Sequence, residues 1–204
     1  MKQKILLAAI AITAVFCMFS CSEDDGTVEE YPNWQWQNET FFNHLSDSVK
    51  ALIEADPSRS DWKRIKNWTK TGEYTGTNAD YVIVKVVGEG PATETSSPKY
   101  TDTVAVHYAG RLLPSASYAQ GLRFDASFDE PFDEATSVVS EMRVSATVDG
   151  FATALQSMHR GDHWIVYIPY QLGYGTVAKS TIPAYSTLVF DIRLKDFWRT
   201  KSTE

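Results

Sequence analysis

The sequence predicts an α+β fold, in which a curled antiparallel β-sheet packs over one short α-helix and a helical N-terminal extension precedes both. Three observations carry this prediction. From Tyr81 onward, β-branched and alternating apolar segments recur at short spacing, separated by turn residues. Among them, a single segment after Asp149 has apolar residues at helical spacing. A further helical pattern, over residues 41–53, lies before the strands.

Composition supports one globular domain with appendages. The chain has 204 residues, enough for a sizeable core, and its 13% aromatic and 22% charged residues are typical of a globular rather than a disordered protein. The net charge is −7. Because a nucleic-acid-binding surface needs clustered Lys and Arg, we expect no nucleic-acid partner.

Residues 1–20 are predicted to be a lipoprotein signal peptide. Lys2 and Lys4 precede an apolar stretch, residues 5–16, that is too short to span a membrane. Cys21 follows directly after this region, a pattern that resembles the processing box of bacterial lipoproteins, in which the cysteine is lipidated. Phe19 is bulkier than that box prefers. An ordinary secretory signal with an incidental cysteine is the alternative.

Residues 21–37 are predicted to be a tether. Cys17 and Cys21 are the only cysteines, so the exported domain would have no disulfide and would depend on its core for stability. The acidic run at residues 23–25 resembles the signal that sends some Gram-negative lipoproteins to the cell surface, or is only a solvated tether. The implied location is the envelope of a Gram-negative bacterium, with a lipid anchor at Cys21 in the outer membrane.

The extension, residues 38–79, is predicted to be helical. Asn38 is the expected N-cap, and the helix should end before Pro57 because the residue that precedes a proline avoids the helical region. We expect the extension to pack on its own chain and the protein to be a monomer, since one short helix is too small for a stable dimer interface. The apolar stripe consists of Phe41, Phe42, Leu45, Val49, Leu52 and Ile53, and a shorter apolar face of Trp62, Ile65 and Trp68 follows it.

Residues 80–197 form the predicted sheet domain, and residues 198–204 a C-terminal tail. Period-two alternation marks the strands, and turn residues such as those at 88–91 and 160–162 separate them. Strands are expected at 81–87, 103–113, from Phe124, at 142–148, 163–169 and 187–191, and the short helix runs from Asp149, its expected cap, to Met158.

Several short motifs follow one another within residues 81–196. They are Val106-His107-Tyr108-Ala109-Gly110, Phe124-Asp125-Ala126-Ser127, Tyr174-Gly175, Ile182-Pro183 and Thr187-Leu188-Val189-Phe190-Asp191. One such motif would be uninformative, but the ordered set resembles the FKBP-type peptidyl-prolyl cis-trans isomerases. That family has the α+β fold predicted above, and the resemblance implies the same activity for this chain.

The resemblance also implies roles for individual residues. The phenol of Tyr174 would donate to a substrate carbonyl, and the backbone N–H of Val148 would anchor bound ligands. Phe151 stands at the pocket floor, where the family more often has Trp. Asp125 in an apolar pocket needs a hydrogen-bond partner, and the hydroxyl of Tyr108 is the expected one. The implied catalytic residues are Tyr108, Phe124, Asp125, Tyr174 and Phe190, and the implied substrate-binding residues are Val148, Phe151, Ile182 and Leu188.

This set of residues suits a reaction without covalent chemistry. Rotation about an X–Pro bond crosses a barrier of about 18–20 kcal/mol, because the twisted amide loses resonance. An apolar pocket removes the water that favours the planar amide, and positioned donors complement the twisted carbonyl. We expect no metal or other cofactor, and the expected partners are prolyl-containing polypeptides and macrolide inhibitors. Since every matched residue follows Tyr81, residues 22–79 should be dispensable for small-peptide turnover.

Two departures from the family leave a second function open. Phe151 is smaller than Trp, and the segment between Phe132 and Val148 is longer than the family pattern, so that Val138, Met142 or no residue replaces the remaining pocket Phe. The alternative function is a non-catalytic peptide- or glycan-binding surface lipoprotein on the same fold. A glycan would stack on the four tryptophans that precede the sheet domain, which otherwise pack this part of the chain onto the domain: Trp34, Trp36, Trp62 and Trp68.

Overall fold

The computed structural model describes residues 28–70 and 76–199. The predicted signal peptide, Cys21 and the acidic run of the tether lie outside the described residues. The helices and strands are α2 (Trp34–Ala55), β1 (Trp62–Lys66), β2 (Tyr81–Gly88), β3 (Thr103–Arg111), β4 (Arg123–Ala126), β5 (Ser140–Arg143), α3 (Asp149–Leu155), β6 (His163–Ile168) and β7 (Leu188–Trp198), with short 3-10 helices η1 (Asn78–Asp80), η2 (Val144–Ala146) and η3 (Tyr170–Leu172).

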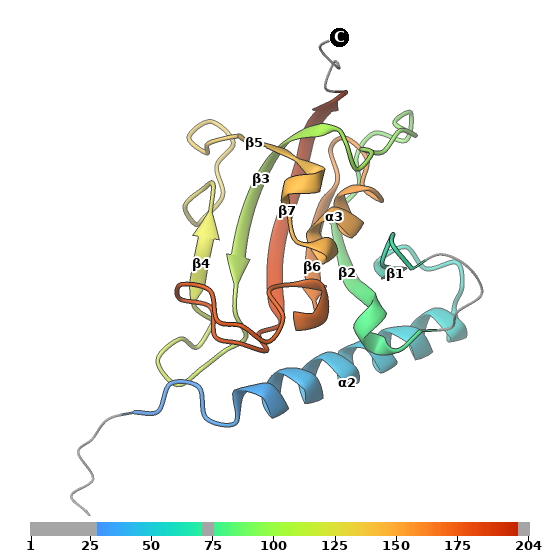
Figure 1. The fold of residues 1–204 in the computed structure, drawn as a ribbon. Helices are drawn as coiled ribbons and strands as arrows, with labels where there is room; N and C mark the ends of the chain where they lie inside the picture. Colours follow the sequence, from blue (N-terminus) through green and yellow to red (C-terminus); the bar gives the residue numbers. More distant parts are fainter. Residues whose placement is uncertain (1–27, 71–75, 200–204) are drawn as a thin grey trace, which may run out of the picture.

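The sheet confirms the predicted fold class. Its strand pairs are antiparallel in the order β1-β2-β6-β7-β3-β4, and β5 pairs with the first half of β3, while β4 pairs with the second half. The sheet curls around α3, which lies against one face, and α2 runs along the lower end of the strands (Figure 1).

The main core lies between the concave face of the sheet and α3. Alternate residues of β2, Val82 and Val84, and of β6, Trp164 and Val166, are buried in it. This is the period-two pattern of a strand with one covered face. The indole of Trp34, from the start of α2, belongs to the same cluster. Helix α2 therefore contributes to the core of the sheet domain itself.

Helix α2 begins at Trp34, inside the segment predicted to be tether, so the prediction that Asn38 caps the helix is wrong. The residue before the helix, Asn33, has a left-handed backbone and makes no side-chain cap hydrogen bond. Asn38 is fully buried, where its Nδ2 donates to the carbonyl of Trp34 and its Oδ1 accepts the backbone N–H of Thr187. Asn was expected to cap the helix because it is typical of N-caps. Its actual partner, Thr187, is too distant in the sequence for a local pattern to reveal.

The buried face of α2 is rotated relative to the predicted apolar stripe. Phe42 and Val49 are buried as predicted, but Phe41 and Leu52 are 38% and 40% exposed. The polar Ser46 is buried in the same face. A search for apolar residues does not include a serine among core positions. The apolar pattern therefore locates the centre of the buried face only approximately.

Helix α2 packs on its own chain, as predicted. Phe42 and Val49 form a second apolar cluster with Ile83 of β2, flanked by Trp62 and Tyr167. The rings of Trp62 and Tyr167 stack with their centroids 6.5 Å apart. Within residues 28–70 and 76–199, no helix is both long and apolar enough to cross a membrane.

The extension is not wholly helical, in contrast to the prediction, because residues 62–66 form strand β1. β1 pairs with β2 along its whole length and gives that strand a hydrogen-bonded neighbour. Ile65 packs against the main core, whereas Trp62 belongs to the second cluster. These residues therefore alternate between the two faces of the sheet, a period that three apolar positions in a short segment do not distinguish from a helical one.

The four tryptophans that precede the sheet domain lie in different environments. Trp34 is buried in the main core, and Trp62 stacks on the second cluster. Trp68 packs against Tyr100 with ring centroids 4.3 Å apart, and Trp36 is 67% exposed. They do not form one stacking platform, so they give no support to glycan binding.

The approach to α3 also differs from the prediction. The strand expected at 142–148 ends at Arg143, because the chain leaves the edge of β3 there and turns through η2 into the helix. Val148 is the N-cap residue and makes no side-chain cap bond, so Asp149 is the first helical residue rather than the cap. The hydroxyl of Thr153 donates to the carbonyl of Asp149 at 2.7 Å.

Candidate functional site

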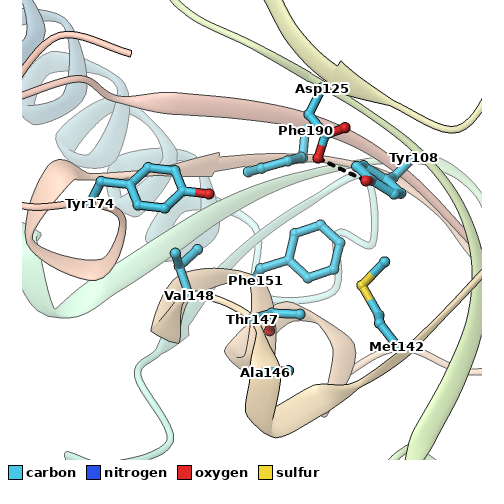
Figure 2. A pocket seen from close by; sticks show the side chains of 9 residues that line it. All are labelled: Tyr108, Asp125, Met142, Ala146, Thr147, Val148, Phe151, Tyr174 and Phe190. Carbon is cyan, nitrogen blue, oxygen red and sulfur yellow. Dashed lines mark hydrogen bonds between the residues drawn. The ribbon is translucent and has the colours of Figure 1, made fainter. Parts of the chain in front are cut away.

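A pocket of about 220 Å³ lies beside the N-terminal end of α3, on the concave side of the sheet. Strands, helix and loop segments all contribute to it, and Figure 2 shows their side chains around a common space. The lining residues are Tyr108, Asp125, Met142, Ala146, Thr147, Val148, Phe151, Tyr174 and Phe190.

Phe190 is the centre of an aromatic floor. Its ring centroid lies 4.9 Å from that of Phe151 and 5.5 Å from that of Phe124, and both contacts are edge-to-face. The ring of Tyr108 lies 6.4 Å away at a tilt. In an edge-to-face pair, the positive edge of one ring contacts the negative face of the other, and this attraction adds to the stabilisation from burial. The floor is therefore a packed set of rings from β3, β4, β7 and α3.

Gly110 allows these rings to lie close to β3. A β-carbon at this position would be 2.6 Å from the rings of both Phe124 and Phe190. The strand register places Gly110 opposite Phe190 on one side and Asp125 on the other. Any side chain here would displace the floor, which gives a physical reason for the glycine in Val106-His107-Tyr108-Ala109-Gly110.

Tyr108 donates a hydrogen bond from its hydroxyl to Oδ2 of Asp125 at 2.8 Å (Figure 2), which confirms the predicted partnership. Burial first, and then the hydrogen bond and the negative charge of Asp125, raise the pKa of Tyr108 to about 12. Tyr108 is therefore a neutral phenol at neutral pH. Its backbone N–H donates to Oγ of Ser127 at 2.9 Å, and its carbonyl accepts the N–H of Ser127 at 2.8 Å. The serine of Phe124-Asp125-Ala126-Ser127 thus fixes the pair in place.

Tyr174 enters the pocket from the side opposite Tyr108 and Asp125, on the segment between η3 and β7 (Figure 2). The residue is 38% exposed, and its hydroxyl points toward the space between the walls. Burial raises the pKa of Tyr174, and the negative charge of Asp125 adds to that effect. Gly175 follows in the left-handed region with φ 72°, so the backbone can turn away directly after the tyrosine.

Three predicted site residues do not line the pocket. Phe124 packs on Phe190, while Ile182 and Leu188 are buried in the main core. They support the walls from behind rather than face a ligand. The other predicted residues are brought together at the pocket, namely Tyr108, Asp125, Val148, Phe151, Tyr174 and Phe190.

Met142, Ala146 and Thr147 also line the pocket. Of the two residues considered for the missing pocket Phe, Met142 lines the pocket, whereas Val138 is 67% exposed and lies outside the lining. Ala146 and Thr147 were not predicted, because the sequence favoured a continuous strand there. The turn η2 brings them to the pocket, and no local signal in the sequence marks it.

The pocket combines an apolar floor with few polar groups. The hydroxyl of Thr147 donates to the carbonyl of Val144 at 2.8 Å, and that of Tyr108 donates to Asp125. The phenol of Tyr174 is thus the pocket hydroxyl best placed to donate to a ligand carbonyl. Among the described residues, no group of three or more His, Cys, Asp or Glu side chains is arranged to hold a metal ion.

Residues 94–195 match the family model of the FKBP-type peptidyl-prolyl cis-trans isomerases. The chain is 30% identical to the isomerase FkpA of Aeromonas hydrophila over 149 residues, which cover 70% of this chain and 51% of that protein. It is 28% identical to FkpA of Escherichia coli K12 over 162 residues, or 78% and 54% of the two chains. The chain therefore spans about half the length of these curated relatives.

A solved structure shares the fold. The crystal structure of FkpA from Escherichia coli aligns with a TM-score of 0.50 and 21% identity, covering 97% of this chain and 71% of that one. At this level of identity the likeness extends to the fold and no further.

Proposed function

The chain belongs to the FKBP-type peptidyl-prolyl cis-trans isomerase family, and from this premise we propose that it isomerises X–Pro bonds and so assists the folding of exported or surface proteins. One observation carries the proposal: an aromatic floor faces a positioned phenol donor across a small pocket. Prolyl-containing polypeptides are the proposed substrates. Macrolide inhibitors of the family would compete for the same pocket.

The proposed mechanism is desolvation with stabilisation of the twisted amide. The proline ring rests on Phe151 and Phe190, which exclude water from the amide. As the bond twists, the nitrogen lone pair leaves resonance, and the transition state binds better than either planar form. The hydroxyl of Tyr174 donates to a substrate carbonyl, and the backbone N–H of Val148 provides a second donor. No step needs a nucleophile or a cofactor.

The remaining residues of the predicted site have supporting roles in this proposal. Asp125 accepts from Tyr108 and keeps that phenol oriented at the wall. Phe124 holds Phe190 in place through its edge-to-face contact. Ile182, in the loop before β7, and Leu188, the first residue of β7, are buried in the core and anchor this part of the chain beside the pocket.

We propose a lipid anchor at Cys21 that holds the domain in the envelope of a Gram-negative bacterium, at the outer membrane. The support is the sequence pattern of residues 1–25. In cell fractionation, the wild type should sediment with membranes, whereas Cys21→Ala should be released or left unprocessed. Equal membrane association of the two proteins would contradict the anchor. Replacement of the acids at 23–25 by alanine tests separately whether surface exposure depends on them.

A protease-free isomerisation assay on Leu-Pro and Phe-Pro tetrapeptides, with the chain from residue 22 onward, tests the activity. We expect exchange faster than the uncatalysed rate, whose time constant is tens to hundreds of seconds, with no metal added. A rate equal to the uncatalysed one would overturn the proposal. Turnover below that of a relative with Trp at the floor would not, because the smaller Phe151 already predicts some loss.

The second candidate function is peptide binding without turnover. Two features of the sequence favour it: Phe151 is smaller than the Trp more common in the family, and the segment between Phe132 and Val148 is longer than the family pattern. The same assay separates the two functions. Saturable binding of the tetrapeptide without faster exchange would support the binding module.

A further inference from the structure

The segment between η3 and β7, residues 173–187, carries Tyr174 to the pocket and is named the flap below. All of it is described, and apart from one isolated bridge between Lys179 and Ile182 it contains no helix or strand. A loop of this length rarely keeps one conformation without contacts from outside. The contacts that hold the flap are therefore part of how the site is built.

Side chains from the first turns of α2 supply these contacts. The indole N–H of Trp34 donates to Oγ of Ser186 at 2.8 Å, and the hydroxyl of Ser186 donates to the carbonyl of Pro183 at 2.7 Å. Oδ1 of Asn38 accepts the backbone N–H of Thr187 at 2.7 Å. Trp34, Asn38, Ser186 and Thr187 are all buried, so water does not compete for these bonds.

Asn38 joins the helix to the end of the flap. A buried amide destabilises a protein unless both of its ends are paired. Here Nδ2 donates to the carbonyl of Trp34 at 2.7 Å, while Oδ1 serves Thr187. Without Asn38, the N–H of Thr187 would be a buried donor with no acceptor from the helix. The polar residue in an apolar helix face thus has a specific partner in the flap.

The first part of the flap is tied to the same helix through Tyr170. Its hydroxyl donates to Oε1 of Glu39 at 3.1 Å, and its carbonyl accepts the N–H of Gly175 at 2.8 Å. The carbonyl of Gly175 in turn accepts the N–H of Tyr185 at 3.0 Å. The N–H and the carbonyl of Gly175, the residue after Tyr174, are therefore both hydrogen-bonded. Their partners are Tyr170, which contacts Glu39 of α2, and Tyr185, which precedes the contact of Ser186 with Trp34.

We propose that the first turns of α2 are a positioning element of the site, in which Trp34 and Asn38 hold the flap so that Tyr174 faces the floor. This inference rests on the proposed function and extends it. It replaces the expectation that residues 22–79 are dispensable for turnover. Displacement of a catalytic group by about 1 Å can lower a rate about a hundredfold, so a loosened flap should affect turnover.

Asn38→Leu tests the inference, since it keeps the number of side-chain heavy atoms and favours the helix, but removes the acceptor for Thr187. Asn38→Asp retains an Oδ acceptor for the same N–H but replaces the Nδ2 donor to Trp34 by a buried carboxylate oxygen, so it separates the flap contact from overall stability. Ser46→Ala is the matched control: Ser46 is buried on the same helix face, but its hydroxyl donates to Asn78 at 2.9 Å, away from the flap. Trp34→Phe removes the indole donor together with part of a buried ring, and serves if Asn38→Leu does not fold.

Each variant is measured in three ways: thermal unfolding, kcat/KM on a Leu-Pro tetrapeptide, and hydrogen exchange of individual backbone amides. Asn38→Leu should lower kcat/KM about tenfold or more, and flap amides should exchange at least about tenfold faster while those of β3 and β7 do not. Asn38→Asp should recover part of the flap protection, while its buried carboxylate lowers the unfolding temperature. Ser46→Ala should lower the unfolding temperature and leave flap exchange and turnover unchanged.

Two results would overturn the inference. One is an equal loss of kcat/KM in Asn38→Leu and Ser46→Ala, and the other is flap amide exchange that changes in neither Asn38→Leu nor Trp34→Phe. Hydrogen exchange decides it even if the wild type shows no turnover. Absence of turnover would count against the proposed function instead, so the two failures are distinguishable.

Discussion

The two sides of the pocket are held in different ways. The floor residues Tyr108, Phe151 and Phe190 lie on β3, α3 and β7, where hydrogen bonds of the helix and the strand ladders fix the backbone. The flap that carries Tyr174 has one isolated bridge of its own and is held by side chains of α2. One side is therefore set by regular structure and the other by a few buried side-chain contacts.

This difference separates two kinds of sensitivity. A substitution in the floor removes packed apolar surface, so it should reduce stability and activity together. A substitution at the flap or its supports leaves the floor intact, so it should reduce activity more than stability. The substitutions below test that distinction from the largest expected effect to the smallest.

The largest effect is expected from Phe190→Ala in the floor. The side chain is 6% exposed and contacts the rings of Phe124 and Phe151, so its loss should lower the free energy of unfolding by about 3–5 kcal/mol. The pocket would also admit water to the amide. Denaturant unfolding and the isomerisation assay measure the two losses, and Phe190→Leu should retain more of each. A folded Phe190→Ala with full turnover would show that the pocket is misplaced.

Asp125→Asn should change how the stability of the protein depends on pH in the alkaline range, through Tyr108. The pKa of Tyr108 should fall from about 12 toward its ordinary value, but stay above that value because burial is the largest cause of the shift. A raised pKa contributes stability that is complete below the unfolded value of about 10. That contribution is lost as the pH rises toward 12 in the wild type, and less is lost in the variant.

Tyrosinate absorbance and unfolding followed across this alkaline range measure the change. Tyr108→Phe, which removes the titrating group, identifies the signal. If Tyr108 ionised at its ordinary pKa in the wild type, the hydrogen bond and burial at this wall would not be as described.

Tyr174→Phe should have a smaller effect, confined to activity. It removes one donor, worth about 0.5–1.5 kcal/mol or about a two- to tenfold loss of kcat/KM. Because Tyr174 is 38% exposed, the unfolding midpoint should hardly change. Tetrapeptide kinetics and thermal unfolding of the same sample make the comparison with Phe190→Ala. A large loss of stability would place Tyr174 with the floor instead.

The smallest effect is expected from Glu30→Gln, just before α2. Glu30 accepts hydrogen bonds from Oγ of Ser115 at 2.5 Å and the N–H of Ser117 at 3.0 Å, and these bonds lower its pKa. A lowered pKa contributes stability above the unfolded value and loses it as the pH falls through the folded one. The two proteins should differ slightly in unfolding midpoint at neutral pH and converge in acid, with equal turnover. A difference in unfolding midpoint that grew as the pH fell would contradict the lowered pKa of Glu30.

The floor could be predicted from the sequence because its residues lie in locally patterned strands and in the one short helix. Alternation and β-branched runs indicated β2, β3 and β6, and the ordered motifs indicated Tyr108, Asp125 and Phe190 at the floor side and Tyr174 on the flap. The hydrogen bond between Tyr108 and Asp125 followed from the need to pair a polar group beside apolar ones.

The flap supports could not be predicted in the same way. Asn38 resembles an N-cap in the sequence, and only its contact with Thr187 shows that it is buried within the helix. Strand β1 forms because β2 offers it an edge, and η2 forms where the chain must leave β3. Each depends on a neighbour brought close by the fold, which local periodicity does not encode.

The central claim is that prolyl segments bind and isomerise between the floor and the flap. Amide shift mapping by NMR, with the chain from residue 22 onward and a Leu-Pro tetrapeptide, tests it most directly. The largest shifts should fall at Tyr108, Val148, Phe151 and Tyr174, while the cis and trans signals of the peptide exchange faster. Shifts confined to the exposed side of α2 around Trp36, or pocket shifts without faster exchange, would contradict it.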